Sequence, residues 1–304
     1  QGGTAGQKIQ LLTEARQLLV NTEQMLQKYP VKRVIAFFPY KASMWECMES
    51  IWRTATVDEE VETYVVPIPY FDLKNGQVTE RHYEGGNFPK YVPITDYRNF
   101  PLEQYQPDVA FIHNPFDRNN LVTSVLPEYY SDRLKQWVNK LVYVPYFMSL
   151  DSVYITHRFL PSYLNCDYIV TQNEKMAESF DPVIPKEKFL PLGSPIADRA
   201  IYLDRHRPEI PQEWMDMLPE GKSFENCRKI LLNTSISQLL QQGERFLDKI
   251  EAVFHQTRQM DRLLLIWRPH PLLKISAKMQ SEQLASRLEQ LEKEFLQKKL
   301  GILD

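Results

Sequence analysis

Apolar residues recur at helical spacing over residues 6–29, near the start of the chain. The positions that repeat every three or four residues are Ile9, Leu11, Leu12, Ala15, Leu18, Leu19, Met25 and Leu26. Pro30 closes the pattern, because a proline disfavours helical backbone in the residue before it. We therefore predict an amphipathic helix in an N-terminal segment, residues 1–30. We expect it to pack on the outside of the following domain, with docking to a partner or to a membrane face as the alternative.

Short apolar runs alternate with helical patterns from residue 31 onward. The runs predicted as strands cover residues 34–38, 64–66, 109–112, 141–144, 168–170 and 188–192, and helices are expected over 44–55 and from about Pro195. Strands interleaved with helices are joined by right-handed crossovers, which produces a parallel sheet covered on both faces. Residues 31–204 are therefore predicted to form a Rossmann-like α/β domain.

Residues 72–97 interrupt this alternation. The segment is rich in Gly, Pro and Tyr, contains the turn-forming pair Asn75-Gly76, and is too long for a simple crossover. We interpret it as a functional or capping insertion. His82 and Glu84 within it are candidates to close over a substrate, with ordinary surface-loop residues as the alternative.

A second strand–helix–strand–helix series follows a polar, proline-rich stretch. Its strands are predicted over 229–232 and 263–267, and its helices over 237–258 and 275–299. The domain boundary is therefore expected between Asp204 and Lys229, and residues 205–304 are assigned to a second Rossmann-like domain. A further strand starts within residues 301–304, so we expect the second domain to be incomplete at its C-terminus.

Composition restricts the classes of protein and of partner. With 304 residues, 43% hydrophobic and 25% charged, the chain has the composition of a soluble protein with room for two domains. A net charge of -3 argues against binding nucleic acid over a broad surface, although a local basic patch remains compatible with it. Any anion site is therefore expected to be local.

Cysteine usage and hydropathy indicate the compartment. Cys47, Cys166 and Cys227 are too widely spaced for a disulfide framework or a zinc signature, and this spacing favours a reducing compartment. The sequence predicts neither a metal site nor a cofactor. No apolar run approaches the roughly 20 residues that span a bilayer, and the N-terminus lacks a signal-peptide pattern. We expect a cytoplasmic protein, with peripheral association at the inner face of the membrane left open.

The segment Trp267-Arg268-Pro269-His270-Pro271 is the strongest candidate for a functional site. It follows the apolar run 263–266, and ligands of parallel sheets bind at the carboxyl ends of strands. The prolines restrict the backbone around Arg268 and His270, and these two side chains can hold phosphate oxygens. The alternative is a proline-rich turn with a solvated His and an Arg paired with an acid. Neither GxxxxGK[ST] nor GxGxxG occurs, which argues against P-loop hydrolases and NAD-type dehydrogenases.

Asn233-Thr234-Ser235 ends the first strand of the second series. Its hydroxyls and backbone amides lie before a predicted helix, so all three residues are candidates for binding a nucleotide phosphate. Simple capping of the helix is the alternative for Thr234 or Ser235. Gly193 and Ser194 occupy a similar strand-to-helix turn, and we interpret them as the seam between the two domains.

Two loops of the first series carry further candidates. After the first strand, Lys41 and Ser43 are candidates for binding an acceptor or anion, together with the N-terminus of the next helix, which Ser43 could cap. A plain cap with a solvated lysine is the alternative. After the strand 109–112, His113 is followed by Asp117. A histidine oriented by an acid can act as general base on an alcohol, although a histidine that caps a turn is the competing interpretation.

Three motifs in this order, Gly193-Ser194-Pro195, residues 230–235 and Trp267-Arg268-Pro269-His270-Pro271, resemble the CDP-glycerol glycerophosphotransferase family of teichoic-acid-type enzymes. The resemblance covers residues 31–304 and is strongest from Tyr168 onward. It implies the GT-B fold, in which the active site lies between two Rossmann-like domains. It also implies transfer of glycerol phosphate from CDP-glycerol to a hydroxyl of a cell-wall-type polymer or glycolipid, with release of CMP.

Carried over by motif, the resemblance makes Arg268 and His270 ligands of the donor pyrophosphate, with Asn233 and Thr234 nearby. Two departures limit it. The family's Trp-His-Gly element, whose His is considered the base, falls where this chain has residues 144–147, Val-Pro-Tyr-Phe. The family's Asp-Tyr-Ser-Ser type donor element would lie beyond Asp304. Either His113 substitutes as base or the acceptor chemistry differs.

Two other functions remain open from the sequence. One is a GT-B glycosyltransferase that uses another nucleotide-linked donor, a nucleotide sugar. The other is a non-catalytic GT-B-like binding module that keeps the fold without the chemistry. The sequence predicts neither the identity of the acceptor nor the oligomeric state.

Overall fold

The computed structural model describes residues 5–26, 31–74, 76–120, 122–149 and 152–304. The chain divides into two compact units, Gln1–His206 (unit 1) and Arg207–Asp304 (unit 2). The predicted turn at Asn75-Gly76 and the end of the predicted first helix, residues 27–29, fall at least in part outside the described residues.

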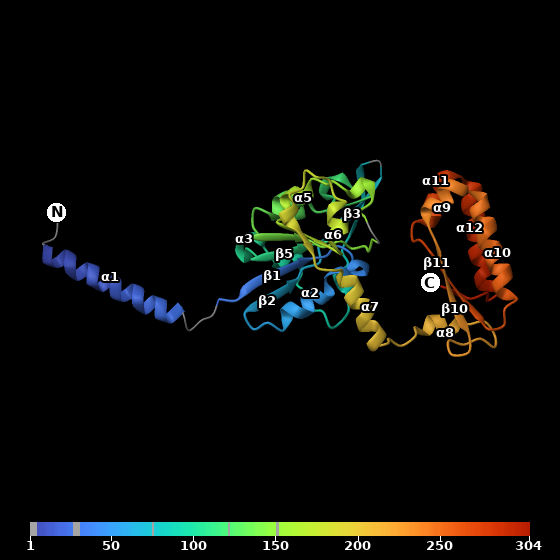
Figure 1. Cartoon of the computed structure of the whole chain (residues 1–304), viewed down its shortest axis with the longest axis horizontal. Helices are drawn as coiled ribbons and strands as arrows, with labels where there is room; N and C mark the ends of the chain where they lie inside the picture. The colour runs from blue at the N-terminus through green and yellow to red at the C-terminus, as the bar shows by residue number, and fades with distance from the viewer. Residues whose placement is uncertain (1–4, 27–30, 75, 121, 150–151) are drawn as a thin grey trace. The chain divides into compact units, whose positions relative to one another are not determined.

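Helix α1 spans Ala5–Leu26 within the N-terminal segment (Figure 1). Its side chains from residue 6 to residue 26 are exposed, including Leu12 and Leu19 at 71% each. The exposure of these side chains gives no support for packing of the helix on the following domain, so that packing stays a prediction. Among the described helices, none combines the length and the apolar character needed to cross a bilayer.

Unit 1 is built around a six-stranded, all-parallel sheet with the order β2-β1-β5-β7-β8-β9. This confirms the predicted α/β class. The strands are β1 (Arg33–Phe38), β2 (Val61–Val65), β5 (Val109–Ile112), β7 (Lys140–Tyr143), β8 (Tyr168–Thr171) and β9 (Phe189–Pro191). The helices that accompany them are α2 (Glu46–Thr56), α3 (Leu102–Tyr105), α4 (Ser131–Leu134), α5 (Ser162–Asn165), α6 (Glu174–Glu178) and α7 (Pro195–Arg205).

Both faces of this sheet are covered, which explains why its inner strands are mainly apolar runs. Ala36 and Phe38 on β1 belong to one hydrophobic cluster, together with Ile112. Phe37, between them, belongs to a second cluster that contains Trp45. Successive side chains of a strand point to opposite faces, so a strand covered on both sides needs apolar residues at every position.

The first part of the insertion belongs to a small antiparallel sheet with the order β4-β3-β6, in which β6 comes from a later segment of the chain. Its strands are β3 (Tyr70–Lys74), β4 (Gln77–His82) and β6 (Thr123–Val125). The sequence analysis predicted an insertion here but no strands. Most of β4 is exposed and polar, so it carries little of the apolar pattern by which strands are recognised.

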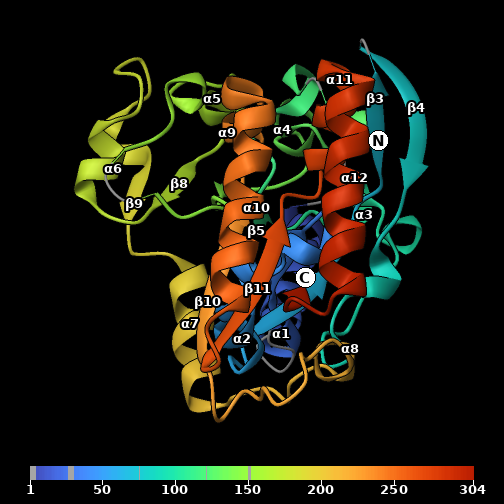
Figure 2. The ribbon, with the colours of Figure 1, turned by 90° about the vertical axis from the view of Figure 1, so that its right-hand side faces the viewer.

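Unit 2 contains a three-stranded parallel sheet with the order β10-β11-β12. Its strands are β10 (Arg228–Thr234), β11 (Leu263–Pro269) and β12 (Ile302–Leu303). The helices of unit 2 are α8 (Gln212–Asp216), α9 (Ile236–Gln242), α10 (Glu244–Arg258), α11 (Leu273–Gln280) and α12 (Glu282–Gln297). Helices α9 to α12 cover one face of the sheet (Figures 1 and 2). Together with that face they form the larger core of the unit.

Each of the two long helices predicted for unit 2 is interrupted once. Gly243, with φ 51°, separates α9 from α10, a conformation that favours glycine. Ser281 separates α11 from α12, and its side chain accepts a hydrogen bond from the backbone N–H of Leu284 as the N-cap of α12. Helical periodicity continues across both breaks, which is why the sequence pattern predicted single helices.

Strand β11 is buried on both faces. Leu265 and Trp267 belong to the core formed with α9 to α12. Leu264 and Ile266 belong to a smaller cluster that Trp214 helps to cover. This packing fixes the strand that carries the strongest candidate motif of the sequence.

Candidate functional site

The carboxyl ends of β10 and β11 lie side by side and bring together the residues predicted to bind phosphate. Asn233 is the direct neighbour of Arg268 in the parallel register, and the backbone N–H of His270 donates to the carbonyl of Thr234 over 3.0 Å. We call Asn233, Thr234, Ser235, Arg268 and His270 the strand-end cluster. Strand β11 continues through Pro269, so Arg268 lies within the strand, whereas the sequence pattern ended it at Trp267.

Arg268 is half-exposed, and among the described residues its guanidinium is hydrogen-bonded through Nε alone. Its Nε donates to the side-chain carboxylate of Asp304, directly after β12. Asp304 is held there because its backbone N–H donates to the carbonyl of Trp267 over 2.9 Å. The pairing of Arg268 with an acid is the alternative that the sequence left open. It leaves the two terminal amino groups of the guanidinium able to donate to a phosphate.

His270 is exposed, and a hydrogen bond fixes its tautomer. Its Nδ1 accepts from the backbone N–H of Leu272 over 3.1 Å, directly before α11. A neutral imidazole that accepts through Nδ1 carries its proton on Nε2. His270 can therefore donate through Nε2, which suits a phosphate oxygen.

Thr234 does not line the surface of the strand-end cluster, in contrast to the prediction. It is 3% exposed, and its hydroxyl accepts a hydrogen bond from the indole N–H of Trp267 over 3.2 Å. Alternation along β10 turns Thr234 towards the core, while Asn233 before it is exposed. The side chain of Ser235 accepts from the backbone N–H of Gln238, so Ser235 has the capping role that the sequence analysis gave as the alternative.

His113 lies directly after β5, where the sequence predicted it, but it is completely buried. Its Nε2 accepts a hydrogen bond from the backbone N–H of Tyr40 over 3.0 Å, and its Nδ1 has no protein partner among the described residues. Burial, and next the charge of Lys41, lower the pKa of His113 from 6.5 to about 3. In this arrangement His113 is neutral and its acceptor nitrogen is occupied, as in the competing interpretation of a structural histidine.

The predicted pairing of Asp117 with His113 does not form. Asp117 accepts hydrogen bonds from the backbone N–H of Ser131 over 2.9 Å and from the hydroxyl of Ser131 over 2.6 Å, at the start of α4. Burial raises the pKa of Asp117. The separation of four positions along the chain was compatible with a pair. Asp117 instead starts a 3-10 turn (η4, Asp117–Asn119) with φ 48°, and its carboxylate fixes the position of α4.

The loop after β1 has a different local structure from the predicted cap. Ser43 lies in a 3-10 turn (η1, Ala42–Met44), and the N-cap position of α2 is Trp45, which makes no side-chain capping bond. The Lys41 ammonium lies 4.9 Å from the ring centroid of Tyr70. Glu84 of the insertion accepts from the backbone N–H of Ala42 over 2.8 Å, so it ties the insertion to this loop. The ammonium of Lys41 therefore lies over an aromatic ring, and the neighbouring backbone N–H of Ala42 is already bound by a carboxylate.

Gly193 and Ser194 form the turn between β9 and α7. Gly193 has φ 104°, and its N–H donates to the carbonyl of Thr171 over 3.2 Å. Both residues line a groove of about 610 Å³ between α2 and α7. They lie inside unit 1, whose last residue is His206, so the division between the units falls after α7 and not at this turn.

Two partners in these sites were not found from the sequence. Asp304 binds Arg268, although only the start of the last strand was recognised. The backbone of Tyr40 binds His113. The contact between Asp304 and Arg268 could have been inferred, because parallel strands end at the same edge of a sheet and Asp304 directly follows the last strand. The contact between Tyr40 and His113 involves a main-chain group, for which the sequence carries no residue-specific signal.

Comparison with known proteins gives similarity to solved structures only. No protein-family model matches the chain, and no curated protein sequence matches it. A Staphylococcus aureus MnaA structure with UDP has a TM-score of 0.45 at 14% identity, covering 82% of this chain and 65% of that chain. Methanocaldococcus jannaschii UDP-GlcNAc 2-epimerase with UDP-GlcNAc and UDP has a TM-score of 0.49 at 12% identity, covering 90% and 73%.

The wall teichoic acid polymerase TagF has a TM-score of 0.42 at 11% identity, with 90% of this chain and 67% of that chain covered. At 65% coverage, this chain spans less than two thirds of the length of the S. aureus MnaA structure. TM-scores below 0.5 and identities this low assign neither a family nor an activity to the chain.

Proposed function

We propose that the chain is a transferase that uses a nucleotide-linked donor, and that the strand-end cluster of unit 2 binds the donor's pyrophosphate. The observation that carries this proposal is the register of β10 and β11, in which the exposed amide of Asn233 is the neighbour of the half-exposed guanidinium of Arg268. His270 adds an N–H donor on the same edge. An arginine, an amide and a neutral histidine at a strand end favour a phosphate ligand over an apolar one.

Our preferred donor is CDP-glycerol, on the motif resemblance of residues 193–195, 230–235 and 267–271. In this reaction an acceptor hydroxyl oxygen bonds to the β-phosphorus, the bond from that phosphorus to the bridging oxygen breaks, and CMP leaves. Charge develops on the transferring and leaving oxygens. Arg268 would stabilise that charge through its terminal amino groups, and His270 would donate through Nε2.

The hydroxyl proton needs an acceptor, and His113 stays the predicted one. Its Nε2 lone pair is used by the N–H of Tyr40, so the imidazole would have to release that bond before it could take a proton. The geometry therefore supports donor binding more strongly than it supports this base. A polymer or glycolipid hydroxyl is the proposed acceptor, and a GT-B arrangement of the two units is part of the proposal.

A turnover assay tests the transferase function. CMP release from CDP-glycerol is measured with the unmodified chain, with Arg268→Ala and with Arg262→Ala, in the presence of lipid-linked and glycerol-phosphate hydroxyl acceptors. Arg262 is exposed and immediately precedes β11, so it is the matched control at the opposite end of the strand. We expect release that depends on an acceptor and on Arg268 but not on Arg262.

Two results would contradict different parts of the proposal, the first the preferred donor and the second the transferase activity. Turnover of UDP-glucose but not CDP-glycerol would assign the chain to nucleotide-sugar glycosyltransferases. Donor binding without turnover of either compound would indicate a binding module.

A further inference from the structure

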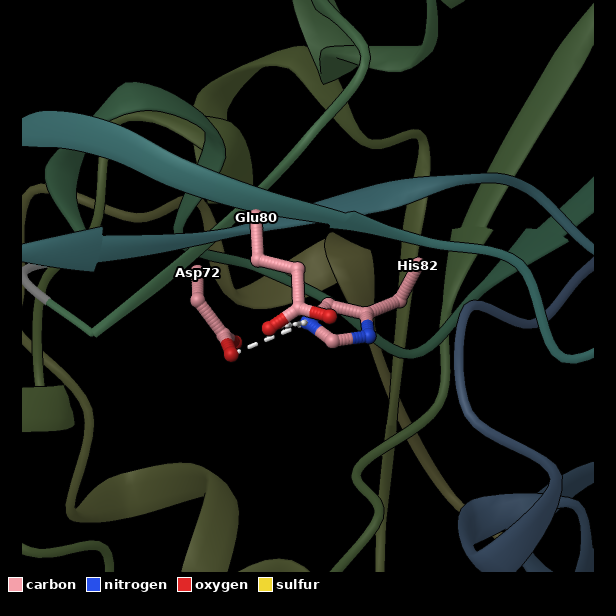
Figure 3. A group of neighbouring side chains, drawn as sticks. All are labelled: Asp72, Glu80 and His82. Carbon is pink, nitrogen blue, oxygen red and sulfur yellow. Dashed lines mark hydrogen bonds and ion pairs between the residues drawn. The ribbon is translucent and has the colours of Figure 1, made fainter.

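The hairpin formed by β3 and β4 carries a carboxylate–histidine group: Asp72, Glu80 and His82 (Figure 3). Asp72 on β3 is the direct cross-strand neighbour of Glu80 on β4, and Tyr70 is the neighbour of His82. Because side chains two residues apart share a face of a strand, all four side chains lie on one face of the hairpin. The group combines two strands, so no spacing along the sequence revealed it.

The three ligand atoms are close enough to bind a single ion. Nε2 of His82 lies 2.9 Å from a carboxylate oxygen of Asp72 and 4.0 Å from one of Glu80. One nitrogen or oxygen of each residue lies within 4.8 Å of the others. Protein ligands bind Zn²⁺ at about 2.0–2.2 Å, so ligands of one ion are separated by roughly 3–4 Å. The side chains are 28%, 46% and 72% exposed for His82, Asp72 and Glu80, which leaves access from solvent.

The charges of this group favour a cation. Like charges directly opposite each other in an antiparallel pair are destabilising. Among the described residues, neither Asp72 nor Glu80 forms an ion pair with a lysine or an arginine. In the part of the chain that the structure describes, the imidazole of His82 is the ion-pair partner of both carboxylates. A divalent cation would neutralise the pair.

A further contact orients the histidine independently of the two acids. The imidazole of His82 stacks on the ring of Tyr70, with centroids 4.9 Å apart and planes at 24°. Tyr70 is itself fixed, because it is 6% exposed and its hydroxyl donates to Glu84 over 2.7 Å. The stack holds the ring with Nε2 facing the carboxylates, as Figure 3 shows. Ligands held in place by neighbouring side chains bind metal more tightly.

We propose that Asp72, Glu80 and His82 bind one divalent transition-metal ion, with Zn²⁺ as the ion that suits one imidazole and two carboxylates. Water would occupy the remaining coordination positions, given the exposure of the group. The ion would cross-link β3 and β4 and so stabilise the insertion. The site lies in unit 1 and involves no residue of the strand-end cluster, so it stands apart from the proposed transferase function.

Calorimetric titration of the metal-free full chain with ZnCl₂ tests this site. The variants are Asp72→Asn, Glu80→Gln and His82→Ala, and the control is His255→Ala, an exposed histidine of α10. We expect one Zn²⁺ per chain, and a loss of at least about tenfold in affinity in each variant, because even residues that only support metal ligands contribute about that much. His255→Ala should bind like the unmodified chain.

A second measurement keeps the test valid if His82→Ala is poorly folded. The two amide variants conserve shape, and the melting temperature of each is compared with and without ZnCl₂. The proposal predicts a Zn²⁺-dependent rise in the unmodified chain that is lost in Asp72→Asn. Absence of stoichiometric binding, or binding that Asp72→Asn and Glu80→Gln leave unchanged, would overturn the proposal.

Discussion

Arg268 and Asp304 are joined by a hydrogen bond from Nε to the carboxylate, across the ends of β11 and β12. The acid orients the guanidinium, and in the proposed phosphate site it would also compete with an anionic ligand. The pair is partly exposed, with 50% of the Arg268 side chain accessible, so its own contribution to stability is small.

Asp304→Asn is expected to strengthen anion binding at the strand-end cluster. The amide keeps an acceptor for Nε but removes the negative charge that opposes a phosphate. An exposed ion pair is worth up to about 1 kcal/mol, so the affinity for CDP-glycerol should rise by up to about fivefold. Isothermal titration at low and high salt checks this. A lower affinity would mean that the charge of Asp304 is needed to position Arg268.

Thr234→Val should destabilise unit 2 more than its size suggests. Valine keeps the shape but leaves the buried indole N–H of Trp267 without an acceptor. An unsatisfied buried donor costs about 1–3 kcal/mol in the free energy of unfolding. Thr234→Ser, which keeps the hydroxyl and loses one methyl, is the control, with an expected cost of about 1 kcal/mol or less. Urea denaturation measures both, and equal effects would exclude a role for this hydrogen bond.

Gly301→Ala should disturb the strand that positions Asp304. A Cβ at this position would overlap the backbone oxygen of Leu265 on β11 and lie 3.0 Å from Phe295 Cζ. Relief of the overlap requires β12 to move, and overpacking of this kind costs about 1–3 kcal/mol. Gly86→Ala is the control, because no heavy atom lies within 4 Å of its Cβ position. Similar unfolding midpoints for the two variants would contradict the packing of β12 on β11.

Because the pKa of buried His113 is lowered, we expect the stability of the folded chain to decrease as the pH falls. The pKa of His113 is about 3 in the folded chain, against 6.5 for the ordinary group. Between these values the unfolded chain binds the extra proton, so stability is complete above about pH 6.5 and is lost as the pH falls towards 3. The loss approaches about 1.4 kcal/mol per pH unit.

His113→Gln removes this titration and can keep an acceptor for the N–H of Tyr40. The free energy of unfolding, measured between pH 4.5 and 7, should therefore fall less steeply on acidification than in the unmodified chain. His255→Gln, at an exposed position, should leave the slope unchanged. Identical slopes for His113→Gln and the unmodified chain would show that His113 is protonated in the folded state.

The inner strands of the first parallel sheet, and β11 of the second, could be predicted because burial on both faces demands nearly uninterrupted apolar runs. The run around Leu264 and Leu265 identified β11, and the rule that parallel strands end at one edge was enough to bring Asn233 together with Arg268. The orientation of Thr234 could not be predicted in the same way. It depends on β10 continuing two residues beyond the end of its apolar run, which is decided by pairing with β11.

The remaining differences concern side chains that have several possible partners. Asp117 follows His113 closely, yet the carboxylate binds Ser131 because the backbone turns at this residue. His82 and Asp72 meet only through the pairing of β3 with the largely polar strand β4. Sequence distance does not specify such contacts, whereas apolar periodicity specifies the strands of a buried sheet.

The central claim is that Arg268 and His270 bind the pyrophosphate of a nucleotide-linked donor. Isothermal titration of the full chain with CDP-glycerol, CMP and UDP-glucose tests it most directly, with Arg268→Ala and His270→Ala beside the controls Arg262→Ala and His255→Ala. We predict selective binding of CDP-glycerol, weakened about 10- to 100-fold in Arg268→Ala and about 2- to 10-fold in His270→Ala, with both controls unchanged. Equal affinity in all five proteins, or no binding of any of the three ligands by the unmodified chain, would contradict the claim.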